Sequence, residues 1–264
     1  MLKLHQVAKT FNPGTINEKK ALKGIDLHLK PGDFVTVIGG NGAGKSTMLN
    51  AVAGVWPVDG GSVVIDGVDV TGMPEHVRAQ YIGRVFQDPM TGTAPNMQIE
   101  ENLALASRRG RKRGLRWGVT NAEREEYHEK LKILGLGLED RLTAKVGLLS
   151  GGQRQALTLL MAALRRPKLL LLDEHTAALD PATAKKVLEI TDMLIEQNQL
   201  TTLMITHNMK DAIRHGNRLI MMNEGRIIFD VSGEEKSKLT KADLMDKFAE
   251  IAGAGLESDE ILLS

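Results

Sequence analysis

An eight-residue segment limits the folds open to this chain more than any other feature. Residues 39–46 have the sequence Gly-Gly-Asn-Gly-Ala-Gly-Lys-Ser, which matches the phosphate-binding loop pattern G-x4-G-K-[ST]. The β-branched run Phe34–Ile38 before it predicts a buried parallel strand, and residues 48–55 after it predict a helix. A glycine-rich turn with an incidental lysine is the alternative, but the strand and helix on either side favour the loop.

The residue types in this loop suit the binding of a nucleotide's phosphates. Glycines allow successive backbone N–H groups to turn toward one anion, and the N-terminus of the following helix adds partial positive charge. We expect Lys45 to reach the β- and γ-phosphates and the Ser46 hydroxyl to bind Mg²⁺. The expected binding residues are Gly39, Gly40, Asn41, Gly42, Ala43, Gly44, Lys45, Ser46 and Thr47.

Two adjacent carboxylates follow the all-apolar run 169–172, which predicts a second buried strand. Asp173, at the carboxyl end of that strand, is expected to reach the Mg²⁺ held by Ser46. Glu174 is then placed to polarise an attacking water as a general base. A strand that merely ends in a charged turn is the alternative, and the phosphate loop makes it the weaker one.

The order of the predicted elements indicates an α/β fold. Residues 2–8 and 25–30 alternate like antiparallel strands, and Glu224–Gly225 predicts a hairpin between 219–223 and 226–230. Tyr127, Leu131 and Leu134 share one face of a helix expected at 121–134, within a stretch of helical character from 88 to 149. Further strands are expected at 62–65, 83–86 and 202–206, and helices at 156–164 and 182–197. This alternation predicts a sheet covered on both faces and interrupted by a helical insertion.

Composition excludes several kinds of site. The chain has no cysteine, which rules out disulfides, cysteine-ligated metals and a thiol nucleophile. Its 34 Lys and Arg against 33 Asp and Glu give a net charge of +1, which argues against a whole-surface nucleic-acid binder. The N-terminus does not fit a signal peptide, and no apolar run approaches the ~20 residues that span a bilayer. We therefore expect a soluble protein that stays inside the cell.

A third motif lies between the other two. Ser150-Gly-Gly-Gln153 precedes the helix expected at 156–164 and offers a second anion-binding helix terminus. With these three motifs in this order, the chain resembles the ATP-binding cassette (ABC) ATPases over about residues 1–232. Four further positions carry the resemblance: Gln87 is similar to the family's glutamine loop, Asp180 to its aspartate loop, His207 to its switch histidine and Phe11 to the aromatic residue under the adenine. For Phe11, a place in the core is the alternative.

The resemblance implies a P-loop NTPase (RecA-like) core with an N-terminal antiparallel β subdomain and an inserted α-helical subdomain. It implies a nucleotide-binding domain at 1–232, with the core at 1–87 and 158–232 and the insertion at 88–157, followed by a C-terminal helix and tail at 233–264. It also implies ATP hydrolysis with Mg²⁺. The expected catalytic residues are Glu174, His207, Gln87 and Lys45, and the expected metal-binding residues are Ser46, Gln87 and Asp173.

The resemblance further implies a head-to-tail homodimer. Each ATP lies between residues 39–47 of one copy and Ser150, Gly151, Gly152 and Gln153 of the other, with Asp180 also at the nucleotide. Separate integral membrane permease subunits and an extracytoplasmic solute-binding protein are the other implied partners, and the chain is expected to be cytoplasmic and peripheral on the inner face of the membrane. The expected function is that of the ATPase subunit of an importer-like ABC transporter for bacterial uptake of an amino acid or other small organic solute. The alternative is a soluble ABC ATPase acting on nucleic acid or ribosomes, but with a single cassette and no cysteine we expect no nucleic-acid partner.

Two positions depart from the family pattern. His175 stands where the family usually has proline, and Ala177 where it usually has serine. Neither change removes a catalytic group, so hydrolysis is still expected, although its rate and the coupling between subunits become open questions. For His175 we favour a solvent-facing replacement over a pH-sensitive contact.

Two further segments lie outside these motifs. The basic run Arg108–Arg116, followed by Trp117, fits a solvated loop, a contact with anionic lipid or the permease, or a contact with nucleic-acid phosphates. Thr240 and Asp243 have capping-box spacing and predict a helix with Leu244, Phe248 and Ile251 on one side. Residues 253–264 predict a poorly ordered tail.

Overall fold

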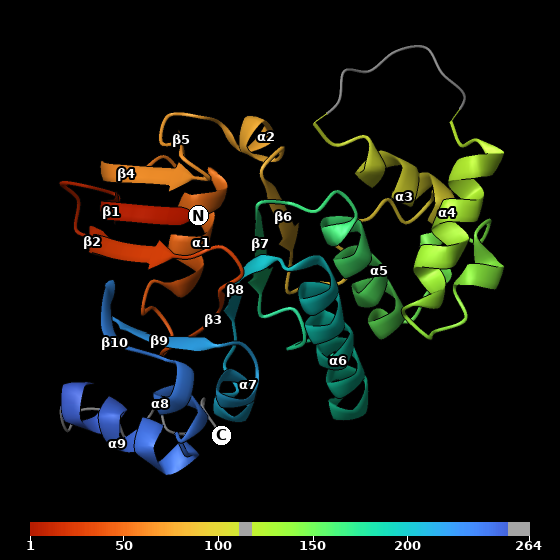
Figure 1. The fold of residues 1–264 in the computed structure, drawn as a ribbon. Helices are drawn as coiled ribbons and strands as arrows, with labels where there is room; N and C mark the ends of the chain where they lie inside the picture. The colour runs from red at the N-terminus through yellow and green to blue at the C-terminus, as the bar shows by residue number, and fades with distance from the viewer. Residues whose placement is uncertain (111–117, 253–264) are drawn as a thin grey trace.

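The computed structural model describes residues 1–110 and 118–252, and it confirms the α/β architecture (Figure 1). A six-stranded sheet in the order β10-β9-β3-β8-β7-β6 lies at its centre. Five of these strands run parallel, and β10 pairs antiparallel with β9 through the expected hairpin. The strands are β3 (Phe34–Ile38), β6 (Ile82–Val85), β7 (Leu169–Asp173), β8 (Thr201–Ile205), β9 (Arg218–Asn223) and β10 (Arg226–Ser232).

A smaller sheet forms the N-terminal subdomain. It has the order β2-β1-β4-β5, and each neighbouring pair is antiparallel, as the alternation predicted. Its strands are β1 (Leu2–Phe11), β2 (Lys19–Leu29), β4 (Gly60–Ile65) and β5 (Val68–Asp69). The short helix α2 (Glu75–Arg78) then leads to β6 in the central sheet.

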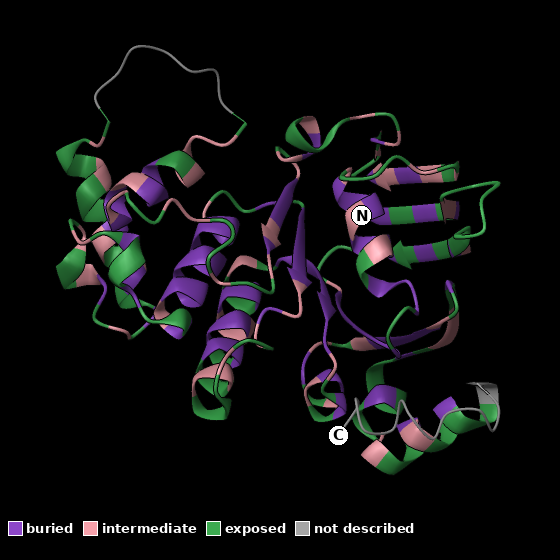
Figure 2. Cartoon of the chain, turned by 180° about the vertical axis from the view of Figure 1, so that it is seen from behind, coloured by how far each residue is buried: buried purple, intermediate pink, exposed green. Residues whose placement is uncertain are grey.

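Alternate side chains of the central strands enter two different cores. In β7, Leu169 and Leu171 pack with the small sheet and with α1 (Lys45–Ala53). Leu170 and Leu172 point to the opposite face, where they pack with α5 (Gly151–Ala163) and α6 (Pro181–Asn198). Both faces of the sheet are therefore covered, and the central strands are almost wholly buried (Figure 2).

The segment expected to be helical from 88 to 149 contains less helix than predicted. It holds α3 (Ile99–Ser107), α4 (Asn121–Lys132) and two 3₁₀ turns, Glu139–Arg141 and Val146–Leu148, while residues 88–98 have no helix. Tyr127, Leu131 and Leu134 are buried together, so the predicted apolar face is confirmed. Residues 111–117, which carry most of the basic run, lie outside the described part of the chain.

The C-terminal helices pack beneath β9. They are α7 (Met209–Arg214), α8 (Gly233–Ser237) and α9 (Lys241–Ala252). The Asp243 carboxylate accepts from the Thr240 amide at 2.8 Å, and the Asp243 amide donates to the Thr240 hydroxyl at 3.2 Å, which confirms the cap. Leu244 and Phe248 are buried in the same cluster as Met221. The side chain of Ile251 and the tail 253–264 lie outside the described residues.

None of the helices in the described ranges is long and apolar enough to span a bilayer.

Candidate functional site

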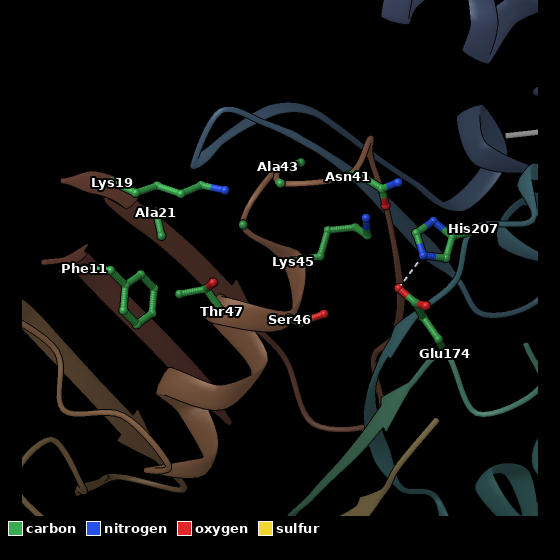
Figure 3. Close-up of a pocket in the computed structure, with 12 residues that line it drawn as sticks. Phe11, Lys19, Ala21, Asn41, Ala43, Lys45, Ser46, Thr47, Glu174 and His207 are labelled. Atoms are coloured by element: carbon green, nitrogen blue, oxygen red, sulfur yellow. Dashed lines mark ion pairs between the residues drawn. The ribbon is translucent and has the colours of Figure 1, made fainter. Parts of the chain in front are cut away.

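A pocket of about 250 Å³ opens between the small sheet and the carboxyl ends of the central strands. The phosphate loop and α1 form its floor, with Phe11 and Lys19 on one side and Glu174 and His207 on the other (Figure 3). Its lining residues are Phe11, Lys19, Ala21, Asn41, Gly42, Ala43, Gly44, Lys45, Ser46, Thr47, Glu174 and His207. The fold therefore brings residues from four distant parts of the sequence to one cavity.

Helix α1 begins at the pocket, at Lys45, three residues earlier than the sequence predicted. Gly44 precedes it with φ +101°, and a Cβ there would lie 2.6 Å from the Ala21 carbonyl oxygen. Only glycine fits both that conformation and that space. The first turn of a helix has amides without intrahelical partners, so this end of α1 is suited to bind an anion.

The Lys45 side chain is hydrogen-bonded to the backbone of the phosphate loop. The side chain is buried, and its Nζ donates to the carbonyl oxygens of Gly39 at 2.7 Å and Gly40 at 3.1 Å. The ammonium group is thereby fixed at the pocket, where a phosphate oxygen can compete for its protons.

Asp173 and Ser46 meet where a cation is expected. The Ser46 hydroxyl lies 3.4 Å from Asp173 Oδ1, and Arg84 Nη2 lies 3.7 Å from Oδ2. Burial raises the pKa of Asp173, as does the neighbouring Glu174, while the charge of Arg84 opposes the shift. A hydroxyl beside a carboxylate supplies the hard oxygen ligands that Mg²⁺ prefers, so these residues fit the ion.

Glu174 and His207 form the opposite wall of the pocket. Glu174 Oε1 lies 2.5 Å from His207 Nε2 (Figure 3). The Glu174 backbone has φ +47°, and its amide donates to the Ile205 carbonyl at 3.1 Å, which joins the ends of β7 and β8. The carboxylate therefore stands at the end of a buried strand, ready to accept a proton within the pocket.

Ser150–Gln153 and Asp180 do not line this pocket. Ser150 caps α5, which starts at Gly151, five residues earlier than predicted, so Gly151 and Gly152 both lie inside its first turn. Asp180 caps α6, and its carboxylate accepts from the Thr183 amide at 3.1 Å. A Cβ on Gly152 would lie 2.1 Å from Thr183 Cγ2, so the starts of α5 and α6 lie against each other.

Gln87 also stands apart from the pocket lining. It is exposed, just beyond the end of β6. The structure therefore brings together the phosphate loop, the carboxylates and His207, but not the glutamine expected beside them.

Two pocket residues, Lys19 and Ala21, were missed by the sequence reasoning. Lys19 in β2 is paired with Phe11 in β1, and its Nζ would lie 3.3 Å from a Cβ on Gly42 of the phosphate loop. Phe11 is half-buried, and its ring packs edge-on against Trp56 with centroids 4.7 Å apart. Only the strand register could have identified Lys19, because nothing in the motif spacing refers to it.

The prediction for His175 was wrong. Its side chain does not face solvent but is 1% exposed, beneath α6. The left-handed backbone at Glu174 turns the chain at this point, and the next side chain points inward. Burial lowers the pKa of His175 to about 4, so the imidazole is neutral. Ala177 lines a neighbouring cavity between α6 and α7 that also borders Glu174 and His207.

Comparisons with known proteins agree with this geometry. The ABC transporter family model matches residues 22–177. A tyrosine transport ATP-binding protein of Clostridioides difficile is 42% identical over 253 residues, which cover 94% of this chain and 98% of the relative. The spermidine/putrescine import ATP-binding protein PotA of Haemophilus influenzae is 33% identical over 89% of this chain and 59% of the relative. The dimeric structure of an ATP-binding cassette in a post-hydrolysis state, bound to ADP and Pi, is 31% identical and superposes with a TM-score of 0.74, covering 88% of this chain and 98% of that one.

Proposed function

The chain belongs to the ABC transporter family as an ATP-hydrolysing, ATP-binding subunit, and from that premise we propose that it energises uptake of an amino acid such as tyrosine. Two observations support uptake of a small organic solute. The relative that matches almost the whole chain is a tyrosine transport protein, and a second relative serves spermidine and putrescine import. The resemblance of the sequence to importer ATPases points the same way.

One observation carries the proposal. The phosphate loop, Ser46 and the Glu174–His207 pair border a single pocket, and the Asp173 carboxylate lies 3.4 Å from the Ser46 hydroxyl at its edge. Hydrolysis of a nucleoside triphosphate needs these three parts, namely a phosphate cradle, a cation site and a base for the attacking water.

ATP occupies the pocket with its phosphates on the loop and its adenine toward Phe11. Lys45 would bind the β- and γ-phosphates, and Ser46, Asp173 and Gln87 would hold Mg²⁺. Bound Mg²⁺ neutralises charge on the phosphate oxygens. Glu174 accepts the proton of the attacking water, and His207, whose Nε2 faces the same carboxylate, is a second proposed contact of the γ-phosphate.

The site needs a second copy of the chain to be complete. Ser150, Gly152 and Asp180 lie outside the pocket of their own chain, and Ser150 and Gly152 stand at a helix N-terminus suited to an anion. In a head-to-tail dimer these residues face the ATP of the partner copy. Binding of ATP closes the two copies together, and hydrolysis reopens them.

In this proposal, the closing and reopening of the two copies changes the conformation of separate membrane permease subunits. The partners are an integral membrane permease and an extracytoplasmic solute-binding protein that acts through it, with this chain peripheral on the cytoplasmic face. The helical insertion at 88–157 is the proposed contact with the permease. We likewise propose that residues 1–87 and 158–232 form the nucleotide-binding core and that residues 233–264 form a separate C-terminal segment.

Steady-state hydrolysis of Mg-ATP tests the catalytic part. Glu174→Gln keeps the shape of the side chain but removes its basicity, and we expect turnover to fall at least ~100-fold with ATP still bound. Lys45→Ala should weaken ATP binding itself. Glu196→Gln, at an exposed position of α6, is the matched control and should leave both quantities unchanged. Near-normal turnover of Glu174→Gln would remove that residue from the role of base.

Partner capture and uptake test the transport part. Tagged Glu174→Gln protein with ATP, purified in detergent from native membranes, should recover a permease in near-stoichiometric yield. Recovery of ribosomes or DNA without a membrane protein would instead support the soluble ABC ATPase. Cells whose only copy is Glu174→Gln should lose uptake of labelled tyrosine, and unchanged uptake would refute the choice of solute.

A further inference from the structure

The residue after the proposed catalytic base is fastened in place by a buried polar network. His175 is 1% exposed and lies under α6. Its imidazole Nε2 is 3.0 Å from the Thr191 hydroxyl of α6, and its carbonyl oxygen is 2.7 Å from Nε2 of Gln155 in α5. The strand end that carries Glu174 is thus attached to two helices.

The direction of the His175–Thr191 bond follows from the other bond of the hydroxyl. Thr191 Oγ1 lies 2.8 Å from the Val187 carbonyl, which can only accept, so the hydroxyl proton is used there. Thr191 must therefore accept from His175 Nε2–H. The Thr191 hydroxyl has no second proton to offer, so this bond requires that Nε2 of His175 carries a proton.

The main-chain attachment is equally directed. The Gln155 amide donates one proton to His175 and the other to the Phe86 carbonyl at 2.9 Å, just before Gln87. Its Oε1 is buried and has no hydrogen-bond partner among the described residues. Both neighbours are carbonyls, so the amide keeps this orientation although its oxygen stays unsatisfied.

Glu174 needs these hydrogen bonds from its surroundings because its backbone has an unfavourable, left-handed conformation. A non-glycine residue at φ +47° has a strained backbone that persists only where its surroundings fix it. The Glu174 amide is held by Ile205, and its carbonyl accepts from the Ala177 amide at 2.9 Å. The bond from His175 to Thr191 fixes the next residue, so the direction of the Glu174 side chain depends on it.

We propose that His175 is a positioning residue, whose buried hydrogen bond to Thr191 holds the Glu174 carboxylate against His207 in the geometry required for hydrolysis. The proposal rests on the proposed function, in which Glu174 is the base. His175 lines no part of the nucleotide pocket, so it acts on turnover through Glu174 and not through ATP binding.

Three substitutions isolate the bond. His175→Leu keeps an apolar side chain of suitable size but removes the donor, whereas His175→Gln places an amide N–H near the position of the imidazole Nε2. Thr191→Val keeps the shape of threonine and removes the acceptor. We expect kcat to fall about 5- to 10-fold in His175→Leu and Thr191→Val, the size expected for one lost buried hydrogen bond. We expect KM for Mg-ATP to change less than ~2-fold. His175→Gln should recover most of the lost kcat.

The Glu174→Gln background separates positioning from a structural role. A residue that acts through the carboxylate has no further effect once the carboxylate is absent, so His175→Leu should leave the single-turnover rate of Glu174→Gln unchanged. The same fractional loss in both backgrounds would overturn the proposal, and so would an unchanged kcat in both His175→Leu and Thr191→Val. If His175→Leu does not fold, the Thr191→Val pair decides alone. Failure of Glu174→Gln to lower turnover would instead refute the proposed function.

Discussion

Lys236 allows a direct test of how the C-terminal helices stabilise the catalytic core. This α8 lysine is 2% exposed, and its Nζ donates to the carbonyl oxygens of His215 and, at 2.8 Å, Gly216. Burial lowers its pKa from 10.5 to about 8, against the opposing charge of Asp192. Between pH 8 and 10.5 the unfolded chain therefore binds a proton that the folded protein has lost. The free energy of unfolding must then rise with pH across this window.

The size of the effect follows from the shift. A difference of about 2.5 in pKa corresponds to about 3 kcal/mol, which native Lys236 gains as the pH rises from 8 to 10.5. Lys236→Met keeps the stem but cannot titrate, so it should lack this gain. Other groups also titrate in this pH range. Their contributions are common to both proteins, so they cancel when the free energy of unfolding of Lys236→Met is subtracted from that of the native protein at each pH.

Urea unfolding at pH 7.5, 9 and 10.5 measures that difference. Lys238→Met is the matched control, because Lys238 lies at the end of the same helix with an exposed side chain, 3.8 Å from Glu234. Its stability should follow that of the native protein at every pH. Parallel curves for Lys236→Met and the native protein would refute the reasoning.

Two further predictions concern the other end of the molecule. Arg78→Met should lower the free energy of unfolding by about 3 to 5 kcal/mol in denaturant titrations. The reason is that the buried guanidinium donates to four carbonyls, including those of Ala51 and Val52 in the last turn of α1. A decrease below ~1 kcal/mol would contradict this. Phe11→Ala should weaken binding of a fluorescent ATP analogue about 3- to 10-fold if the ring contacts the adenine, whereas Phe11→Trp should restore it, and equal affinities would place Phe11 in the role of a core residue.

The elements that the sequence predicted well are those fixed by local pattern. Phe34–Ile38 is a strand with the predicted limits, because a β-branched run ending at glycine has few alternatives. The Asp173 carboxylate lies 3.4 Å from the Ser46 hydroxyl because parallel strands end at one edge of the sheet, while its role as a metal ligand stays a prediction. The order of the strands in the central sheet then determines which other residues lie at this edge and line the pocket.

The predictions failed where the low helix propensity of glycine misplaced a helix start, or where tertiary structure determines which way a side chain points. The start of α5 was placed too late because two glycines argue against helix, although Ser150 and Gln153 have capping-box spacing and form that box. The burial of His175 depends on the backbone at Glu174, whose positive φ no local pattern predicts for a glutamate. Lys19 reaches the pocket only through the pairing of β1 with β2.

The motif Ser150–Gln153 shows what the fold adds to the sequence. A motif in the sequence does not reveal whether it serves the pocket of its own chain, and only the fold shows that Ser150 lies outside it. Yet α5, which begins at this motif, also carries Gln155, bonded to the strand ends that lead to Gln87 and Glu174. The helix that would meet the partner's ATP in the proposed dimer is thus hydrogen-bonded to the segments that carry Gln87 and Glu174 of its own chain.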